Sequence, residues 1–166
     1  MEIIIRPIKQ EDAYAIWQMR HMEGVFENLL ALPSERLQKN IDFVNSLGEN
    51  DHHLVACVND QVIGEISLTK SNQPRLNHVA YMAMMVHKDY QNQGVGSKLM
   101  TAILDLADQW LMVRRIELEV YEDNQRAIHL YEKHGFVVEG IKKQAVIKEG
   151  KFANLCVMAR INDQTH

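Results

Sequence analysis

Apolar side chains recur along this chain with two different periods, and the period changes from one segment to the next. Residues 3–6 are rich in β-branched side chains, which predicts an opening strand. Ala13, Ile16 and Trp17 then recur at helical spacing, directly after an acidic pair of the kind that favours a helix N-terminus. The chain is therefore expected to begin with a strand followed by a helix.

A second, short amphipathic helix is predicted in the next segment. Leu37, Ile41 and Val44 share one helical face. Ser34 is the expected N-cap of this helix, and Gly48 is its expected stop.

Three consecutive strands are predicted after this helix. Residues 54–58 and 62–68 flank Asn59-Asp60, a pair that tolerates positive φ, and this pattern predicts a tight antiparallel hairpin. A further strand is expected at residues 78–86.

The second half alternates between helical and strand periods. A long helix starting near Gly96 is predicted to bury one face, formed by Leu99, Ile103, Leu106, Ala107 and Trp110. Residues 116–121 alternate as a strand, and residues 124–134 are typical of a helix that ends at Gly135. The last strands are expected at residues 136–140 and 152–161.

The predicted order of elements is βααβββαβαββ within residues 1–166, which we interpret as a single domain. Hairpins in the first half and strand-helix alternation in the second predict an α/β fold. Its sheet should be mixed and mainly antiparallel, with helices on both faces.

Composition and charge exclude several classes of protein. The 166 residues are 46% hydrophobic and 24% charged, as expected of a packed globular domain. A formal net charge of −4 argues against sequence-wide attraction to nucleic acid. The longest nearly apolar run, residues 79–86, is far shorter than the roughly 20 residues that cross a bilayer, and the first residues lack the basic start of a signal peptide. We therefore expect a cytoplasmic protein without nucleic-acid or membrane partners, in which Cys57 and Cys156 are buried, reduced thiols.

The strongest candidate chemistry lies between the strand ending at Val86 and the helix beginning near Gly96. Glycines at positions 94 and 96 let the backbone turn tightly, so that N–H groups and the positive end of the helix dipole face one anion, such as a diphosphate. A strand-to-helix turn can also need such glycines for geometry alone. A P-loop would need Gly at Gln91 and Lys at Ser97, and a dinucleotide fingerprint would need a third glycine at Leu99, so both signatures fit poorly.

Two motifs make the chain similar to the GNAT family of N-acetyltransferases. The family's Gln/Arg-x-x-Gly-x-Gly/Ala turn is matched by Gln91, Gly94 and Gly96. Its Asn-x-x-Ala-x-x-x-Tyr-x-x-x-Gly-Phe segment is matched over residues 124–136. The resemblance covers about residues 79–136 and implies the acyl-CoA N-acyltransferase fold. It also implies acetyl transfer from acetyl-CoA to a primary amine by direct attack in a ternary complex.

The resemblance also implies where acetyl-CoA binds. Backbone groups at Met84, Met85 and Val86 would hold the pantetheine arm and the thioester oxygen, and a bulge or a splayed strand there would free N–H groups for this purpose. The diphosphate would lie on the turn formed by Gln91, Asn92, Gln93, Gly94, Val95, Gly96 and Ser97. Because many relatives carry basic residues where this chain has Asn92-Gln93, we expect affinity to depend on backbone N–H groups and Lys98.

Tyr131 is the candidate general acid that the resemblance implies. A phenol can return a proton to the departing thiolate of coenzyme A. From the pattern alone, Tyr131 would be a tyrosine that packs its ring and exposes its hydroxyl. Asn124 is a candidate coenzyme A ligand and, equally, a candidate N-cap of its helix, with Asp123 as a competitor.

Glu119 matches the position that ribosomal-protein acetyltransferases use as a proton acceptor. A carboxylate is a weak base unless burial raises its pKa or a water relays the proton, so two solvated strand carboxylates, Glu117 and Glu119, are the simpler interpretation. Glu65, His78 and a water relay remain alternative bases. Relatives that acetylate histones place a glutamate on the strand that corresponds to residues 77–86. This segment contains no glutamate, which argues against their protein-lysine mechanism here.

We expect a small primary amine as acceptor, with an amino acid favoured over a polyamine. Glu23, Glu27 and Glu35 could attract a polyamine, but a solvated acidic face is the simpler interpretation. The alternatives are a ribosomal-protein-type N-terminal acetyltransferase, a regulatory module that binds acetyl-CoA without catalysis, and a nicotinamide-dependent reductase. No metal site is expected from the histidine spacing, and a homodimer is expected from the resemblance alone.

Overall fold

Residues 1–163 are described by the computed structural model, and within them seven strands form one sheet in the order β1-β2-β3-β4-β5-β7-β6. The strands are β1 (Ile4–Pro7), β2 (Asp51–Val58), β3 (Gln61–Lys70), β4 (Val79–Val86), β5 (Arg115–Tyr121), β6 (Val137–Lys148) and β7 (Lys151–Ile161). The helices are α1 (Ala13–Arg20), α2 (Leu37–Asn45), α3 (Val95–Asp105) and α4 (Gln125–Lys133). β4 and β5 run parallel, and the other neighbouring strands pair antiparallel. The predicted element order and the mixed, mainly antiparallel sheet are confirmed.

The predicted hairpin joins β2 and β3. Its two turn residues, Asn59 and Asp60, have φ values of 49° and 65°. Two left-handed residues in a two-residue turn match the right-handed twist of the flanking strands, which explains why this pair closes the hairpin.

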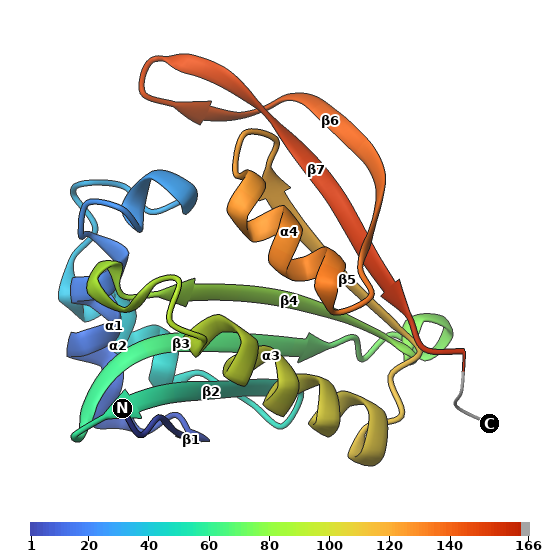
Figure 1. Cartoon of the computed structure of the whole chain (residues 1–166), viewed down its shortest axis with the longest axis horizontal. Helices are drawn as coiled ribbons and strands as arrows, with labels where there is room; N and C mark the ends of the chain where they lie inside the picture. The colour runs from blue at the N-terminus through green and yellow to red at the C-terminus, as the bar shows by residue number, and fades with distance from the viewer. Residues whose placement is uncertain (164–166) are drawn as a thin grey trace.

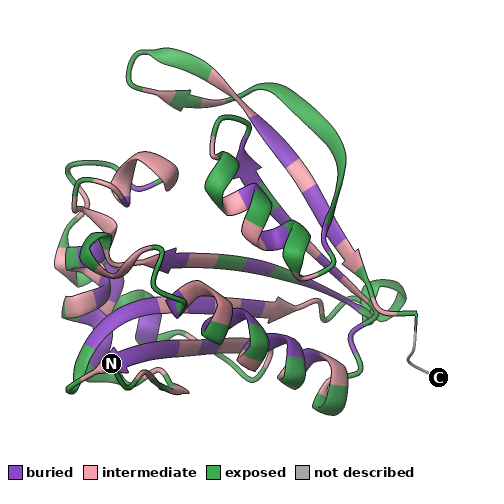
Figure 2. Ribbon diagram, in the orientation of Figure 1, coloured by how far each residue is buried: buried purple, intermediate pink, exposed green. Residues whose placement is uncertain are grey.

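Helices cover both faces of the sheet, as expected (Figure 1). On one face, Leu99 and Ile103 of α3 pack with Ile63 and Leu68 of β3 in the larger hydrophobic cluster. On the other face, Ile16 and Met19 of α1 pack with residues of β2 and β3. Buried residues therefore run along the middle of β2 and β3 in Figure 2.

Both cysteines are buried free thiols, as predicted for Cys57 and Cys156. Burial raises the pKa of each thiol. A raised pKa keeps a thiol protonated and lowers its reactivity.

The second helix differs from the sequence prediction at both ends. It starts at Leu37, after an extended Arg36, and not after an N-cap at Ser34. The residue before Arg36 is tied to α1, because the carbonyl oxygen of Glu35 accepts a 2.9 Å hydrogen bond from Trp17 Nε1. The helix ends at Asn45, before Gly48.

Two further predictions of element extent are wrong. Trp110 is 77% exposed, because the chain widens into a π-helical turn over Leu106–Trp110 and rotates later residues off the buried face. β6 continues to Lys148 instead of ending at Gly140. Its side chains are mostly exposed on both faces, so it lacks the alternating pattern that predicts a half-buried strand.

The sheet opens between β4 and β5. These strands pair only through Val79↔Arg115, Ala80↔Ile116 and Tyr81↔Glu117, and then diverge (Figure 1). β5 stays paired with β7 over its whole length, and β4 stays paired with β3 up to Val86. Among the residues described, the outer half of β4 therefore has one edge without a neighbouring strand.

No helix within residues 1–163 is long and apolar enough to cross a bilayer.

Candidate active site

A cavity of about 1140 Å³ lies where β4 and β5 separate. Its wall combines the end of β4, the turn before α3, one side of α4 and the segment around α1 and α2. Of the predicted site residues, the cavity is lined by Met84, Met85, Val86, Gln91, Asn92, Gly94, Gly96, Ser97, Glu119, Asn124 and Tyr131. Gln93 and Val95 lie outside the wall. Fold topology thus gathers residues that are more than 40 positions apart in the sequence, from Met84 to Tyr131.

Main-chain hydrogen bonds show which edge each β4 residue faces. The carbonyl oxygen of His78 accepts a 3.1 Å bond from the N–H of Arg115, on the β5 side. The carbonyl oxygen of Val79 accepts a 2.9 Å bond from the N–H of Ser71, on the β3 side. Because peptide groups alternate along a strand, even-numbered β4 residues direct their N–H and C=O groups toward β5, and odd-numbered residues toward β3.

This alternation directs the N–H groups of Met84 and Val86 into the opening, beyond the last β5 pair at Tyr81. The backbone of Met85 faces β3 instead, and its side chain packs in the cluster under α1. The β3–β4 register runs without a shift, so the opening comes from splayed strands and not from a bulge in β4. Two adjacent donors on one strand edge can bind a carbonyl oxygen.

The glycine turn presents the N-terminus of α3 to the cavity. Gly94 has φ 87° and stands at the N-cap position, where no side chain caps the helix. A Cβ at Gly94 would meet no atom within 4 Å, so the backbone conformation, rather than space, requires glycine. Gly96 is different, because a Cβ there would lie 2.9 Å from Leu130 Cδ2 of α4. The first glycine shapes the turn and the second allows α3 and α4 to approach.

Side chains of the turn mostly stabilise its shape. Gln91 Nε2 donates to the carbonyl oxygens of Val86 (3.0 Å) and Gly24 (3.2 Å), which ties the turn to β4 and to the segment after α1. Gln93 Nε2 donates to the carbonyl oxygen of Asp89 at 2.9 Å. The Val95 side chain is buried in the core. What remains for an anion is the array of free N–H groups, with the helix dipole behind it.

Tyr131 places a phenol on the cavity wall. The residue is buried, and its ring packs 5.9 Å from the Phe136 ring, between centroids. Its hydroxyl makes no hydrogen bond within residues 1–163, and since no fully buried side-chain atom there lacks a partner, the hydroxyl oxygen is open to the cavity. Burial raises the pKa of Tyr131 to about 12, so the phenol is fully protonated at neutral pH.

Asn124 is the N-cap of α4, one of its two predicted roles. Its Oδ1 accepts a 3.3 Å hydrogen bond from the N–H of Ala127. The residue also lines the cavity, so its side-chain amide lies within reach of a ligand.

Glu119 reaches the cavity but is ion-paired. Its Oε1 lies 2.6 Å from Lys142 Nζ of β6, and its side chain is 45% exposed. The alternative bases are also engaged or lie elsewhere. Glu117 is 2.8 Å from Arg115 Nε, and Glu65 is 2.7 Å from His53 Nδ1. Neither of them, nor His78, lines this cavity.

Glu35 was expected on a solvated face, and this expectation is wrong. Its side chain is 3% exposed, lines the cavity and accepts hydrogen bonds from Arg20 and Asn40. The hydrogen bonds from Arg20 hold the pKa of Glu35 at about 2. Sequence reasoning missed this cluster because Arg20 and Glu35 lie 15 positions apart, across an irregular segment.

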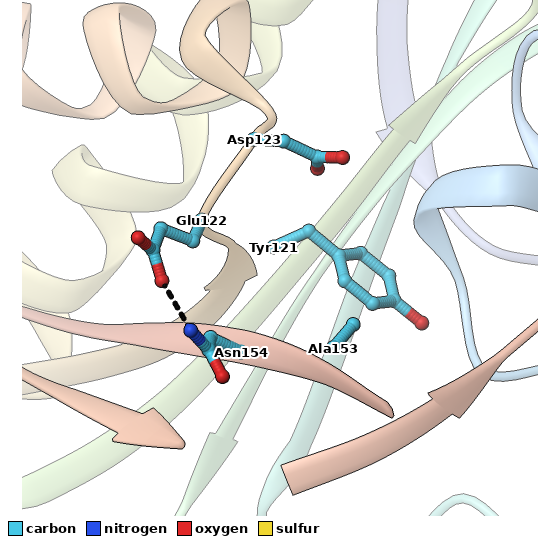
Figure 3. A pocket seen from close by; sticks show the side chains of 5 residues that line it. All are labelled: Tyr121, Glu122, Asp123, Ala153 and Asn154. Carbon is cyan, nitrogen blue, oxygen red and sulfur yellow. Dashed lines mark hydrogen bonds between the residues drawn. The ribbon is translucent and has the colours of Figure 1, made fainter. Parts of the chain in front are cut away.

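A second, smaller pocket of about 320 Å³ lies at the end of β5 (Figure 3). Asn154 Nδ2 donates to Glu122 Oε2 at 2.9 Å across its wall. The Tyr121 hydroxyl donates to the carbonyl oxygen of Leu29 at 3.2 Å and so connects β5 to the segment that lines the main cavity. Within residues 1–163, no group of three or more metal-ligating side chains is present.

The main cavity fits the parts of an acyl-coenzyme A. The uncapped α3 N-terminus suits a diphosphate, and the free β4 edge suits an amide arm and a thioester carbonyl. Arg126 and Lys133 of α4, which also line the cavity, are suited to further phosphate groups.

Comparison with known proteins places this site in context. The sequence profile described as the acetyltransferase (GNAT) family matches residues 11–136. The L-amino acid N-acetyltransferase AaaT of Escherichia coli K12 is 34% identical to the chain, over 96% of the chain and 98% of that protein. The spermidine N(1)-acetyltransferase of the same strain is 23% identical over 96% and 86%. An acetyltransferase of the GNAT family from Streptococcus pneumoniae has a similar structure, with a TM-score of 0.83, 26% identity, and coverage of 96% of this chain and 99% of that one.

Proposed function

This chain belongs to the acetyltransferase (GNAT) family, and from that membership we propose that it acetylates the amino group of free amino acids. It has the acyl-CoA N-acyltransferase fold and is an acetyl-CoA-dependent N-acetyltransferase of small-molecule amines. The choice of amino acids is carried by one observation: an L-amino acid N-acetyltransferase is 34% identical to it over nearly the whole of both chains.

The charge of the cavity supports an amino acid over a polyamine. A polyamine is bound by carboxylates, whereas an amino acid also needs a cation for its carboxylate. Of the two glutamates on the wall, Glu35 is buried and ion-paired with Arg20, which leaves Glu119, in an exposed pair with Lys142, as the carboxylate open to an ammonium group. Besides Arg126 and Lys133, which suit the phosphate groups of coenzyme A, the wall contains two further cations, Arg20 and Lys39.

Acetyl-CoA supplies the acetyl group as a thioester, and the proposed contacts follow its length. The N–H groups around Gly94, Gly96 and Ser97 receive the diphosphate at the α3 N-terminus. The N–H groups of Met84 and Val86 face the thioester oxygen and stabilise the negative charge that develops there as the amine attacks. Removing one such donor typically costs about 10²–10³ in rate.

Tyr131 is the proposed general acid. The amine attacks the thioester carbonyl directly, the C–S bond breaks, and the thiolate leaves. The buried, protonated phenol donates its proton to the sulfur. The Tyr131 hydroxyl is free to donate to the sulfur, because it makes no hydrogen bond within residues 1–163.

Glu119 is the proposed base. An ammonium group of the acceptor can take the place of Lys142 Nζ beside the carboxylate, which positions the amine. The proton then leaves the amine for Glu119, directly or through a water molecule. A direct transfer within a ternary complex requires both substrates to be bound before coenzyme A is released.

The experiment is a thiol-release assay with acetyl-CoA and a panel of acceptors: the proteinogenic L-amino acids, spermidine and spermine, and short peptides with free N-termini. We expect release with one or more amino acids, and initial-velocity lines that intersect, as a ternary complex requires. Release with polyamines or peptides alone would contradict the amino-acid assignment. Parallel lines would contradict direct transfer.

A ligand-binding assay tests the two alternatives in which the protein is not an acetyltransferase: a regulatory module that binds acetyl-CoA and a nicotinamide-dependent reductase. Acetyl-CoA at 100 times its dissociation constant should raise the free energy of unfolding by about 2.7 kcal/mol. A nicotinamide dinucleotide should produce no such shift. Binding of acetyl-CoA without thiol release for any amine would identify a regulatory module instead.

A further inference from the structure

The clearest built feature beyond the catalytic groups is a buried charge cluster on the acceptor side of the cavity. Its centre is Glu35, whose side chain is 3% exposed. Glu35 Oε1 accepts from Arg20 Nε at 2.9 Å and from Asn40 Nδ2 at 2.8 Å, and Oε2 accepts from Arg20 Nη2 at 3.1 Å. Lys39 Nζ lies 3.8 Å from Oε2. This network fixes the plane of the Arg20 guanidinium at the end of α1.

The guanidinium retains free donors. Arg20 uses Nε and Nη2 for Glu35, and its Nη1 makes no hydrogen bond to any of residues 1–163. Its side chain is 30% exposed and lines the cavity. A fixed guanidinium with free N–H groups is the geometry that binds a carboxylate from solution.

The cluster also carries excess positive charge. One carboxylate, Glu35, faces two cations, Arg20 and Lys39, and all three line the cavity. Lys39 is 74% exposed and adds a solvent-facing positive charge, so this part of the wall favours an acceptor that carries a carboxylate over a polycation.

We infer that Arg20 is the specificity-determining residue of the acceptor site: it binds the α-carboxylate of the amino acid, and Glu35 is its positioning residue. This inference depends on the proposed function. The acceptor class is thereby narrowed to α-amino acids with a free carboxylate. Their amides and the matching decarboxylated amines lack the group that Arg20 binds.

The experiment compares two acceptors that differ only in this group. For the best L-amino acid and its primary amide, kcat and KM are measured in wild type and in Arg20→Gln, and the acid-to-amide ratio of kcat/KM is calculated. Loss of a charge-assisted contact predicts that this ratio falls about 10- to 100-fold, through the KM of the acid. The KM for acetyl-CoA should stay within about twofold, since the side-chain hydrogen bonds of Arg20 go to Glu35 and not to the glycine turn.

Two further variants keep the test decisive. Arg20→Gln leaves Glu35 buried without its partner and can destabilise the fold, so Arg20→Gln with Glu35→Gln removes both charges together. This double variant should fold and should still lack the preference for the acid. Arg36→Gln is the matched control, because Arg36 is exposed nearby and lies outside the cavity wall. Its ratio should equal that of wild type.

An unchanged ratio in both Arg20 variants would overturn the inference while leaving amino-acid acetylation in place. A ratio lowered equally in Arg36→Gln would also overturn it, because the effect would then be one of general charge. If wild type acetylates no amino acid but accepts another amine, the proposed acceptor class and the role of Arg20 both fail.

Discussion

At the residue scale, the Tyr131 hydroxyl can be removed without breaking a hydrogen bond, since it makes none within residues 1–163. We expect Tyr131→Phe to lower kcat by about 10²-fold, because the thiolate would leave without a proton donor. Stability should change by no more than about 0.5 kcal/mol. Thiol release and chemical denaturation measure the two quantities. Near wild-type turnover in a folded variant would remove Tyr131 as the acid.

Glu119 and Lys142 form an exposed ion pair, in which the ammonium group of a substrate can take the place of Lys142. We expect Glu119→Gln to lower kcat/KM about 10- to 100-fold and to alter the acidic side of its pH profile, because the proton acceptor is lost. Lys142→Gln is the control: it removes the partner and keeps the carboxylate, so the pH-dependent step should persist. A pH profile of Glu119→Gln that matches wild type would assign the base elsewhere.

Glu35 makes stability depend on pH. Its pKa in the folded chain is about 2, below the usual 4.5, so the ionised form contributes stability above about pH 5, and this contribution is lost as the pH falls from about 4.5 to about 2. We expect Glu35→Gln to lose about 1 to 3 kcal/mol of the free energy of unfolding at pH 7 and to show a weaker acid dependence. Denaturant titrations at pH 7 and pH 3 measure both. Glu23→Gln, at an exposed position, should behave as wild type.

The positions of single site residues could be predicted only where they depend on spacing within one short segment of the sequence. Asn124 precedes its helix directly, so its capping role could be anticipated. The motif's spacing anticipated the position of Tyr131 on the same helix, where it lines the cavity, and its role as the acid stays a prediction. Glu35 could not be placed, because the partner that buries it, Arg20, is brought close only by the packing of α1 and α2. Arg20 was for the same reason not a candidate.

At the element scale, the turn before α3 depends on one backbone conformation. We expect Gly94→Ala to cost about 1 to 2 kcal/mol, because φ 87° strains any residue with a Cβ. Relaxation of this strain would move the N–H groups, so the Kd for acetyl-CoA should rise about tenfold or more. Calorimetric titration measures the Kd. Gly140→Ala is the matched control, since a Cβ there meets nothing within 4 Å and φ is not positive. Equal affinity in both variants would contradict the role of the turn.

The spacing of hydrophobic residues predicted helices and strands well where one face of the element is buried and the other is exposed to solvent. The alternation of β5 and the turn pair Asn59-Asp60 are examples. The same spacing predicted the ends of elements poorly where contacts with distant segments determine them. The π-helical turn moved Trp110 outward, and the exposed half of β6 had no buried face to mark it. The opening between β4 and β5 is a property of two strands, and no single segment encodes it.

At the scale of the whole molecule, the β6–β7 hairpin extends beyond the body of the sheet (Figure 1). Ile147 and Phe152 face each other across it, at 76% and 68% exposure. β7 pairs with β5 from Leu155 to Ile161, so only the tip of the hairpin, residues 146–153, is a two-stranded ribbon. Such ribbons are marginally stable in water, and a second copy of the chain would stabilise this one by covering its apolar side chains. We therefore propose that the protein forms a homodimer through the hairpin.

Sedimentation equilibrium tests this proposal. Wild type is expected as a dimer, and Ile147→Lys with Phe152→Lys as a monomer, because two buried charges would oppose association. Tyr14→Lys, an exposed aromatic on α1, is the control and should remain dimeric. A wild type that sediments as a monomer at all concentrations would contradict the proposal.

The short β4–β5 ladder also joins two consecutive parts of the chain. β1 to β4 and α3, which packs on β3, precede Met112, and β5 to β7 follow it. A nick at Met112, which is 50% exposed, would cut no helix or strand. The parts before and after Met112 meet in the three-pair β4–β5 ladder, in the shared hydrophobic cluster and in the Arg160–Asp108 ion pair. Acetyl-CoA would bind between them, where β4 and β5 separate. Because the acetyl donor would contact both parts, we expect it to protect a chain nicked at Met112 from dissociating.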